Sequence, residues 1–233
     1  MKTPSICRHL LFWIALGSFG MTSCNSSNDS TSQGTPLPIL GPMQIIPNEK
    51  GGQDTVFMKL PELALEDQDG LAFHSDSLQG QIRIVDFFFA SCPGICIDMS
   101  ANMARILANQ EAKAAQNPQR VQGPGLRLVS YTIDPQRDTR DVLSTYAQKH
   151  GVAKGNRNWL FLRGDEAQIH ALAEQYYLLS AGADSTAPGG FLHSGQFLLL
   201  DTRGRIRGLY DGTSPAECAV LEKDLEKLRL EKP

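Results

Sequence analysis

The sequence predicts an α/β fold in which a mixed central sheet is flanked by helices on both faces. From residue 82 onward, segments rich in β-branched and aromatic residues alternate with segments of helical periodicity, as in chains whose strands and helices follow one another. The segment 82–89 is apolar without clean alternation, which is typical of a central strand buried on both faces. Two strand-like segments after residue 195 are separated by a short turn, and this terminal hairpin makes the sheet mixed.

Turn and capping residues divide this pattern into elements. Asp67-Gln68-Asp69-Gly70 is a turn signal that predicts a β-hairpin ahead of the main sheet. Asp138, Asp165 and Ser214 each precede a helical pattern and are expected to cap it. Strands are expected at 60–65, 71–73, 82–89, 126–133, 159–162, 196–201 and 205–210.

The N-terminal residues predict an exported, lipid-anchored protein. Lys2 and Arg8 precede an apolar stretch at 10–19, and Met21-Thr22-Ser23-Cys24 ends in cysteine, as bacterial lipoprotein signals do. Residues 1–23 would then be removed and Cys24 lipidated, which places the chain on a membrane in the cell envelope, at its periplasmic face. The alternative is an uncleaved transmembrane helix, but the stretch is short against the roughly 20 residues that a span needs.

The remaining chain divides into a tether and one domain. Residues 24–55 are rich in Ser, Asn, Gly and Pro, a composition typical of a flexible tether, and 56–233 have the length of a single domain. Removal of the signal leaves 20 basic and 25 acidic residues, a formal charge of −5. This balance argues against nucleic acid as a partner.

Two cysteines stand where the strand at 82–89 gives way to a helical pattern, in Cys92-Pro93-Gly94-Ile95-Cys96. If Cys92 starts the helix, Cys96 lies one turn later on the same side, so the pair can close as a disulfide or hold one soft metal ion. A helix N-terminus favours thiolate, and we expect a lowered thiol pKa at the more exposed cysteine, Cys92. The alternative is a pair of small buried hydrophobes.

The other sulfur-containing residues are expected in the core. Cys218 shares helical spacing with Leu221, Leu225 and Leu228. Met99 and Met103 continue the stripe that begins at Cys96; soft copper ligands are the alternative interpretation.

One histidine is a candidate third ligand. His193 follows a loop rich in Gly, Ala and Pro (181–190) and directly precedes a strand. With a cysteine pair at the end of the first central strand, the element order is thioredoxin-like, and in such a sheet the segment that enters this strand packs against the cysteine turn. The other four are discounted by position, in the signal, the leading hairpin, a helix end and a solvated helix face: His9, His74, His150 and His170.

Four motifs in order resemble those of the Sco/SenC family over about residues 60–228. They are Asp67-Gln68-Asp69-Gly70, Cys92-x-x-x-Cys96, Asp134-Pro135-Gln136-Arg137-Asp138-Thr139 and His193-Ser194. The family comprises copper chaperones and redox partners in assembly of the binuclear copper site of cytochrome c oxidase. The resemblance implies that Cys92, Cys96 and His193 are copper ligands and that Asp134 is a nearby acidic residue that tunes or orients them. The chain departs from the family pattern at Ser91, Ile97 and Arg140.

The resulting hypothesis is that the protein is a membrane-tethered, non-enzymatic carrier of copper(I). Copper(II) would bind to the same residues only with a further ligand. Its expected partner is the copper-bearing subunit of apo cytochrome c oxidase, or another periplasmic copper or thiol-redox protein. The alternative is a thiol-disulfide reductant that acts on the cysteines of an apo copper protein and tolerates loss of His193. A peroxidase is disfavoured, because Phe89 stands where peroxiredoxins have a threonine three residues before the reactive cysteine.

Overall fold

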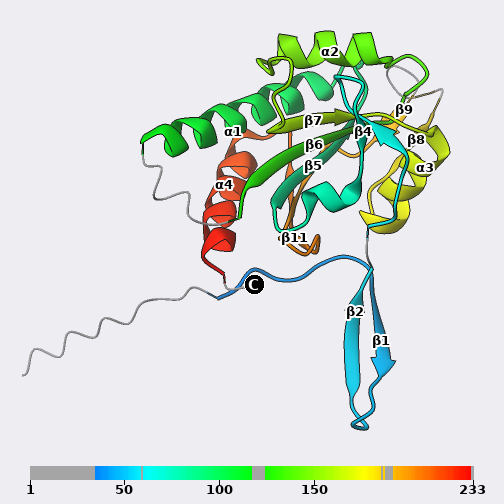
Figure 1. Ribbon diagram of the computed structural model, residues 1–233, viewed down its shortest axis with the longest axis vertical. Helices are drawn as coiled ribbons and strands as arrows, with labels where there is room; N and C mark the ends of the chain where they lie inside the picture. The colour runs from blue at the N-terminus through cyan, green and yellow to red at the C-terminus, as the bar shows by residue number, and fades with distance from the viewer. Residues whose placement is uncertain (1–34, 59, 117–123, 185, 187–190, 232–233) are drawn as a thin grey trace, which may run out of the picture. The chain divides into compact units, whose positions relative to one another are not determined.

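The fold is built on a five-stranded mixed sheet (Figure 1). The computed structural model describes residues 35–58, 60–116, 124–184, 186 and 191–231. The strand order is β11-β10-β5-β6-β7, in which β5, β6 and β7 are parallel and β10 is antiparallel to both of its neighbours. The strands are β5 (Ile82–Phe88), β6 (Leu126–Thr132), β7 (Trp159–Leu162), β10 (Gln196–Leu200) and β11 (Ile206–Asp211). The predicted mixed sheet is confirmed.

The central position of β5 explains its composition. All seven of its residues are buried, and its side chains alternate between two helix-covered faces. The Phe88 ring lies 5.2 Å from that of Tyr146 on one face, whereas the Phe87 ring lies 5.7 Å from that of Tyr177 on the other. A strand covered on both faces does not need to alternate polar and apolar residues. The residues of β5 are accordingly apolar except for Arg83 and Asp86.

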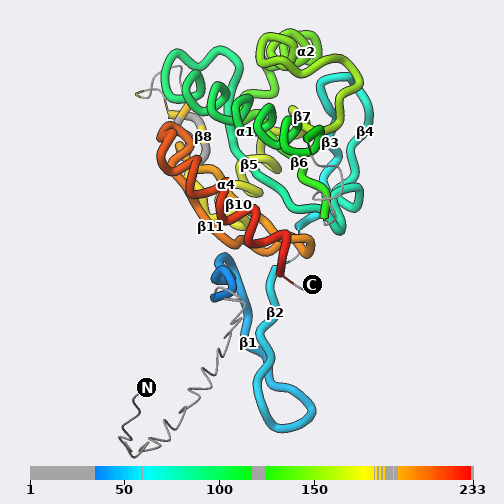
Figure 2. Tube along the Cα trace, turned by 90° about the vertical axis from the view of Figure 1, so that its left-hand side faces the viewer, coloured from blue at the N-terminus to red at the C-terminus, as the bar shows by residue number. Residues whose placement is uncertain are grey.

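Three helices share the Phe88 face of the sheet: α1 (Cys96–Gln116), α2 (Arg140–Lys149) and α4 (Pro215–Leu230). Ser100 of α1 and Tyr146 of α2 are hydrogen-bonded through their hydroxyls at 2.6 Å, and Arg105 of α1 pairs with Glu222 of α4 at 3.2 Å. Figure 2 shows α1 and α2 running along the same side of the strands. The other face is covered by α3 (Glu166–Ala171) and the π-helical turn η2 (Leu172–Tyr176) that continues it.

The leading hairpin is confirmed, although it is shorter than predicted. β3 (Leu65–Glu66) pairs with β4 (Ala72–Phe73) across the predicted turn, and the short helix η1 (Ser75–Leu78) follows. The Asp67 carboxylate accepts hydrogen bonds from the Asp69 and Leu71 backbone N–H groups at 2.9 and 3.0 Å. An aspartate that binds the backbone of its own turn is the usual reason for such a turn signal.

The prediction that 24–55 form a flexible tether is wrong for residues 40–55. Leu40 bridges to Ile206, and β1 (Met43–Pro47) pairs with β2 (Gln53–Phe57). The Asn48 side chain accepts hydrogen bonds from the Lys50 and Gly52 N–H groups at 3.1 and 2.8 Å, which closes the turn between the strands. Ser, Gly and Pro dominate the average composition of this region, and they obscured two short strands rich in β-branched residues.

A second hairpin was also missed. The loop predicted at 181–190 contains β8 (Ala181–Ala183), which pairs with β9 (Phe191–His193). Gly and Ala are poor strand formers, so propensity alone gave no strand signal for β8. The pairing matters because β9 carries the candidate ligand His193.

Two of the three predicted helix caps are confirmed. Asp165 and Ser214 accept hydrogen bonds from the Gln168 and Glu217 N–H groups. The third prediction is wrong: Thr139, not Asp138, is the N-cap of α2.

None of the helices in the described part of the chain is long and apolar enough to cross a bilayer. The predicted signal 1–23 and the predicted lipidation site Cys24 lie outside the described residues.

Candidate metal centre

The two cysteines follow the carboxyl end of β5, with Cys92 in the connection 89–95, here called the cysteine loop, and Cys96 at the start of α1. α1 begins at Cys96 and Cys92 lies before it, so the condition under which both thiols would stand one turn apart on the same helix is not met. Proline at 93 disfavours helical dihedrals at the residue before it, which keeps Cys92 outside the helix. The Cys92 N–H donates to the Phe89 carbonyl at 3.1 Å, and that of Ile97 donates to the Gly94 carbonyl at 3.1 Å.

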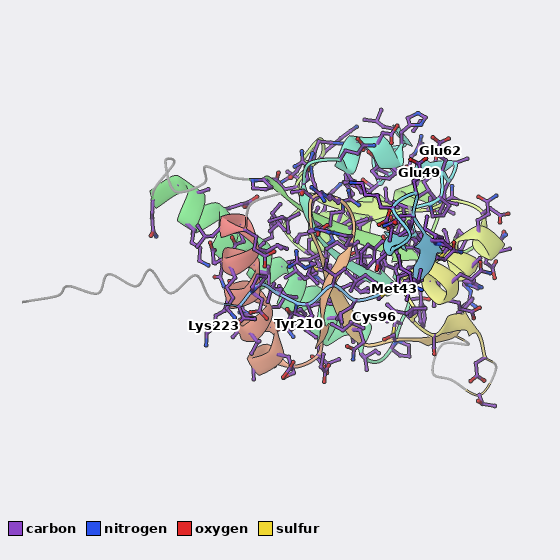
Figure 3. The ribbon with its side chains drawn as sticks, turned by 90° about the horizontal axis from the view of Figure 1, so that it is seen from below. Met43, Glu49, Glu62, Cys96, Tyr210 and Lys223 are labelled. Atoms are coloured by element: carbon purple, nitrogen blue, oxygen red, sulfur yellow. The ribbon has the colours of Figure 1, made fainter. Side chains whose placement is uncertain are left out.

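The two thiols differ in exposure. Cys96 is 1% exposed and points into the domain (labelled in Figure 3), whereas Cys92 is partly exposed, and both are thiols rather than a disulfide. Burial raises the pKa of Cys96 well above its usual value, and a hydrogen bond with the Cys92 side chain raises it further. At Cys96 the cost of burying a charge therefore exceeds the effect of the helix N-terminus, on which the sequence argument for a thiolate relied.

Asp138 joins the cysteine loop to the next strand. Its carboxylate accepts a hydrogen bond from the Ala90 N–H at 3.0 Å and one from the Thr132 hydroxyl at 2.5 Å. The side chain is 1% exposed, and burial raises its pKa. It was mistaken for a helix cap because local sequence shows only the helix that follows, whereas Ala90 lies in the turn after β5, far from Asp138 along the chain.

Asp134 is also buried, at the turn that follows β6. Its backbone N–H donates to the Thr132 hydroxyl at 3.1 Å, and its Oδ2 lies 3.0 Å from Arg137 Nε. The contact with Arg137 is ionic rather than a directed hydrogen bond, since Oδ2 accepts none from the described residues. The side chain is directed to Arg137, and no described contact joins it to either cysteine.

Residues on either side of His193 lie near residues that flank the cysteine pair. The Phe191 ring lies 5.5 Å from that of Phe89, which closes β5. On the other side, a Cβ added to Gly195 would lie 3.5 Å from Ile95 Cδ1, inside the cysteine loop. β9 and the residues that follow it therefore pack against the residues that flank the cysteine pair. For His193 itself the structure describes only the backbone.

Sequence reasoning missed one buried acid in β5, the strand that precedes the cysteines. Asp86 is 1% exposed and accepts a hydrogen bond from the Ser130 hydroxyl at 2.5 Å, and Ser130 in turn accepts one from the Trp159 indole N–H at 2.9 Å. Burial raises the pKa of Asp86 to about 7. The available signal was an aspartate inside the apolar run Ile84-Val85-Asp86-Phe87-Phe88.

The remaining candidates are structural. Met99, Met103 and Cys218 are fully buried, which confirms the core interpretation, and burial raises the pKa of Cys218. His150 ends α2, as predicted, with its ring 4.6 Å from that of Tyr146. The prediction of a solvated His170 is wrong, because its Nε2 lies 3.0 Å from the Ile133 carbonyl oxygen. Among described side chains no three His, Cys, Asp or Glu gather closely enough to hold a metal ion, and that of His193 is not among those described.

Comparison with known proteins gives the family. The SCO1/SenC family model matches residues 58–228, which include the cysteine loop, the Asp134–Asp138 turn and β9. The chain belongs to the SCO1/SenC family.

Relatives from several organisms share this domain. The SCO1 protein homolog of Bacillus subtilis is 28% identical over 169 residues, which cover 70% of this chain and 80% of that protein. A SCO1/SenC family lipoprotein from Bacillus anthracis is 25% identical, with a TM-score of 0.61 over 73% of this chain and 94% of that one. Yeast Sco1, solved with copper bound, is 25% identical, with a TM-score of 0.52 over 70% of this chain and 87% of that one. These neighbours confirm the thioredoxin-like fold.

Proposed function

We propose that this chain is a copper chaperone that binds copper(I) through Cys92, Cys96 and His193 and delivers it to the binuclear copper site of cytochrome c oxidase. The observation that carries the proposal is the convergence of two segments distant in sequence. Ile95, between the two cysteines, lies where a Cβ added to Gly195 would meet it at 3.5 Å, and the Phe89 ring, just before the cysteines, lies 5.5 Å from that of Phe191. These contacts support a position of His193 close to the thiols.

The donor set suits the proposed metal. Two thiolate sulfurs and one imidazole nitrogen are soft and borderline ligands, and copper(I) accepts such a set with low coordination number. The ligands bind copper only when the cysteines are reduced, so oxidation to a disulfide would release it. Metal loading and thiol oxidation are therefore alternatives at this site.

The family supports the same cargo and partner. Yeast Sco1 has been solved with copper bound, and the Sco family to which BsSco belongs is a family of cytochrome c oxidase assembly proteins. The oxidase subunit that bears copper is accordingly the proposed acceptor of this chain. Asp134 is proposed as an acidic residue that orients the site from the turn beyond β6.

A lipid anchor at Cys24 is proposed to hold the domain at the membrane. The lipoprotein from Bacillus anthracis offers a family precedent. Cys24→Ala should abolish acylation and release the processed chain from the membrane fraction, since stable anchoring requires covalent lipid. A Cys24→Ala chain that is still processed and still bound to membranes would contradict the proposal.

Copper(I) titration against a competing chelator tests the metal site. The full chain, reduced and purified in detergent, should bind one copper(I) per molecule, and Cys92→Ser/Cys96→Ser should bind none. Cys218→Ala is the matched control, because it removes a thiol that lies in the core. Unchanged stoichiometry in the double variant would refute the proposal.

His193→Ala separates copper transfer from thiol reduction. A copper carrier should lose at least the 10- to 100-fold in affinity that weaker perturbations around metal sites cause, since a direct ligand is removed. In the His193→Ala variant, the disulfide between Cys92 and Cys96 should still be reduced and re-formed. If copper(I) affinity is unchanged while oxidase assembly still requires Cys92 and Cys96, the protein acts as a thiol reductant instead.

A further inference from the structure

Arg137, in the Asp134–Asp138 turn, lies beside Phe191 of β9. Its guanidinium carbon lies 5.4 Å from the centroid of the Phe191 ring, and its Nε lies 3.0 Å from Asp134 Oδ2. The Phe191 ring also lies 5.5 Å from that of Phe89, which begins the cysteine loop. Arg137 therefore covers the aromatic contact by which β9 is joined to that loop.

The turn that carries Arg137 is fixed without the help of this side chain. The Arg137 and Asp138 N–H groups donate to the Asp134 carbonyl at 3.2 and 2.9 Å. Arg163 donates to the carbonyls of Pro135 and Asp138 at 3.0 and 3.1 Å. Replacement of the Arg137 side chain should leave this platform in place, so any effect on β9 can be assigned to the guanidinium itself.

By contrast, β9 has few attachments. It pairs only with the three-residue β8 among the described strands, and the Ser194 N–H donates to the Ser180 carbonyl at 2.9 Å. Two-stranded ribbons of this length are marginal without packing from elsewhere. The Phe191 ring supplies such packing, and a guanidinium over its face adds a cation–π contact.

We propose that Arg137 is a positioning residue that latches β9 onto the cysteine loop through Phe191, and thereby sets how well His193 completes the metal site. Asp134 holds the guanidinium over the ring through the ionic contact. The proposal rests on the proposed function for its consequence on copper, but the latch itself is a property of the metal-free chain.

Hydrogen exchange in the metal-free chain tests the latch directly. Arg137→Gln should speed amide exchange at Leu192 and Ser194 several-fold, because the ribbon opens more often when the cation–π contact is lost. Arg140→Gln is the matched control: both arginine side chains are 59% exposed, and Arg140 pairs with Asp141 at 3.6 Å instead of contacting a ring. Equal exchange in wild type and Arg137→Gln would overturn the proposal, whatever the copper result.

Copper(I) competition titrations test the consequence. Arg137→Gln should lower affinity roughly tenfold, at the low end of the loss seen when a partner of a metal ligand is removed, whereas Arg140→Gln should not change it. In a His193→Ala background, Arg137→Gln should have no further effect, since the latch acts through His193. An equal loss in both backgrounds would indicate general destabilisation and would refute the positioning role.

The ring contact has its own test. Phe191→Leu keeps an apolar side chain but removes the aromatic face, and Arg137→Gln should then cost no additional affinity. Additive losses in the double variant would show that the two side chains act independently and would overturn the latch. If wild type binds no copper(I), the proposed function fails while faster exchange in Arg137→Gln still supports the latch.

Discussion

The two segments proposed to hold the metal are built in different ways. The cysteine loop joins the buried central strand β5 to the long helix α1, and Cys96 is itself part of the core. Asp138 fixes the start of this loop through the Ala90 N–H. The segment that carries His193 lies in a short two-stranded ribbon outside the main sheet, and a few side-chain contacts hold it at the loop.

This difference suggests that the two segments have different roles in the proposed metal site. The thiols are placed by the same packing that stabilises the domain, so their positions persist as long as the fold does. The histidine segment can move at much smaller cost, because regions with few buried contacts open more readily than the core. We expect copper to be held when β9 closes on the loop and to be exchanged when it opens.

The largest expected effect lies at the buried acid below the cysteine loop. Asp86 has its pKa raised from 3.8 to about 7 by burial, so between these values the folded chain keeps a proton that the unfolded chain has lost. Stability should therefore fall as pH rises through this window. The fall is at most about 4 kcal/mol, at roughly 1.4 kcal/mol per pKa unit.

Asp86→Asn removes the ionisable group and keeps an oxygen that can accept the hydrogen bond from the Ser130 hydroxyl. Urea unfolding at pH 5 and pH 8 should show that the variant loses most of the pH dependence and exceeds wild type in stability at pH 8. An equal fall in both proteins would show that Asp86 is not the titrating group.

A smaller effect is expected at Asp138, which holds the cysteine loop. Asp138→Ala leaves the Ala90 N–H and the Thr132 hydroxyl without their acceptor, and an unsatisfied buried donor costs about 1–3 kcal/mol. The free energy of unfolding should fall by that amount, and Cys92 should be alkylated faster in the native state. Thr139→Ala is the control, since it removes the true helix cap and should leave the alkylation rate unchanged.

The smallest effect is expected at Gly195, on the histidine side. An added Cβ would meet Ile95 Cδ1 at 3.5 Å and Thr213 Cγ2 at 3.9 Å, which are ordinary contacts. Gly195→Ala should change stability by no more than about 0.5 kcal/mol. Its hydrogen-bonded partner Gly212 offers the contrast, because a Cβ there would approach Phe197 at 2.9 Å, and overpacking costs about 1–3 kcal/mol. Similar losses in the two variants by thermal unfolding would contradict a loosely packed histidine side.

Features that depend on residues close together along the chain could be predicted before the structure was known. Hydrophobic periodicity predicts the succession of strands and helices along the chain and the burial of Cys218. Side chains that bind their own backbone predict the turn at Asp67 and the cap at Ser214. The placement of a cysteine pair at the end of β5 was also predictable, since the pair directly follows the apolar run. Each of these signals is contained within a few consecutive residues.

The roles of the buried polar residues, by contrast, depend on contacts between distant segments. Asp138 looked like a helix cap until β5 brought Ala90 to its carboxylate. Asp86 stood in the sequence as an isolated acid, and only the pairing of β5 with β6 places Ser130 beside it. Arg137 reaches Phe191 because parallel strands end at the same edge of the sheet and the ribbon of β8 and β9 packs beside that edge. Such contacts join segments far apart along the chain, so no local pattern contains them.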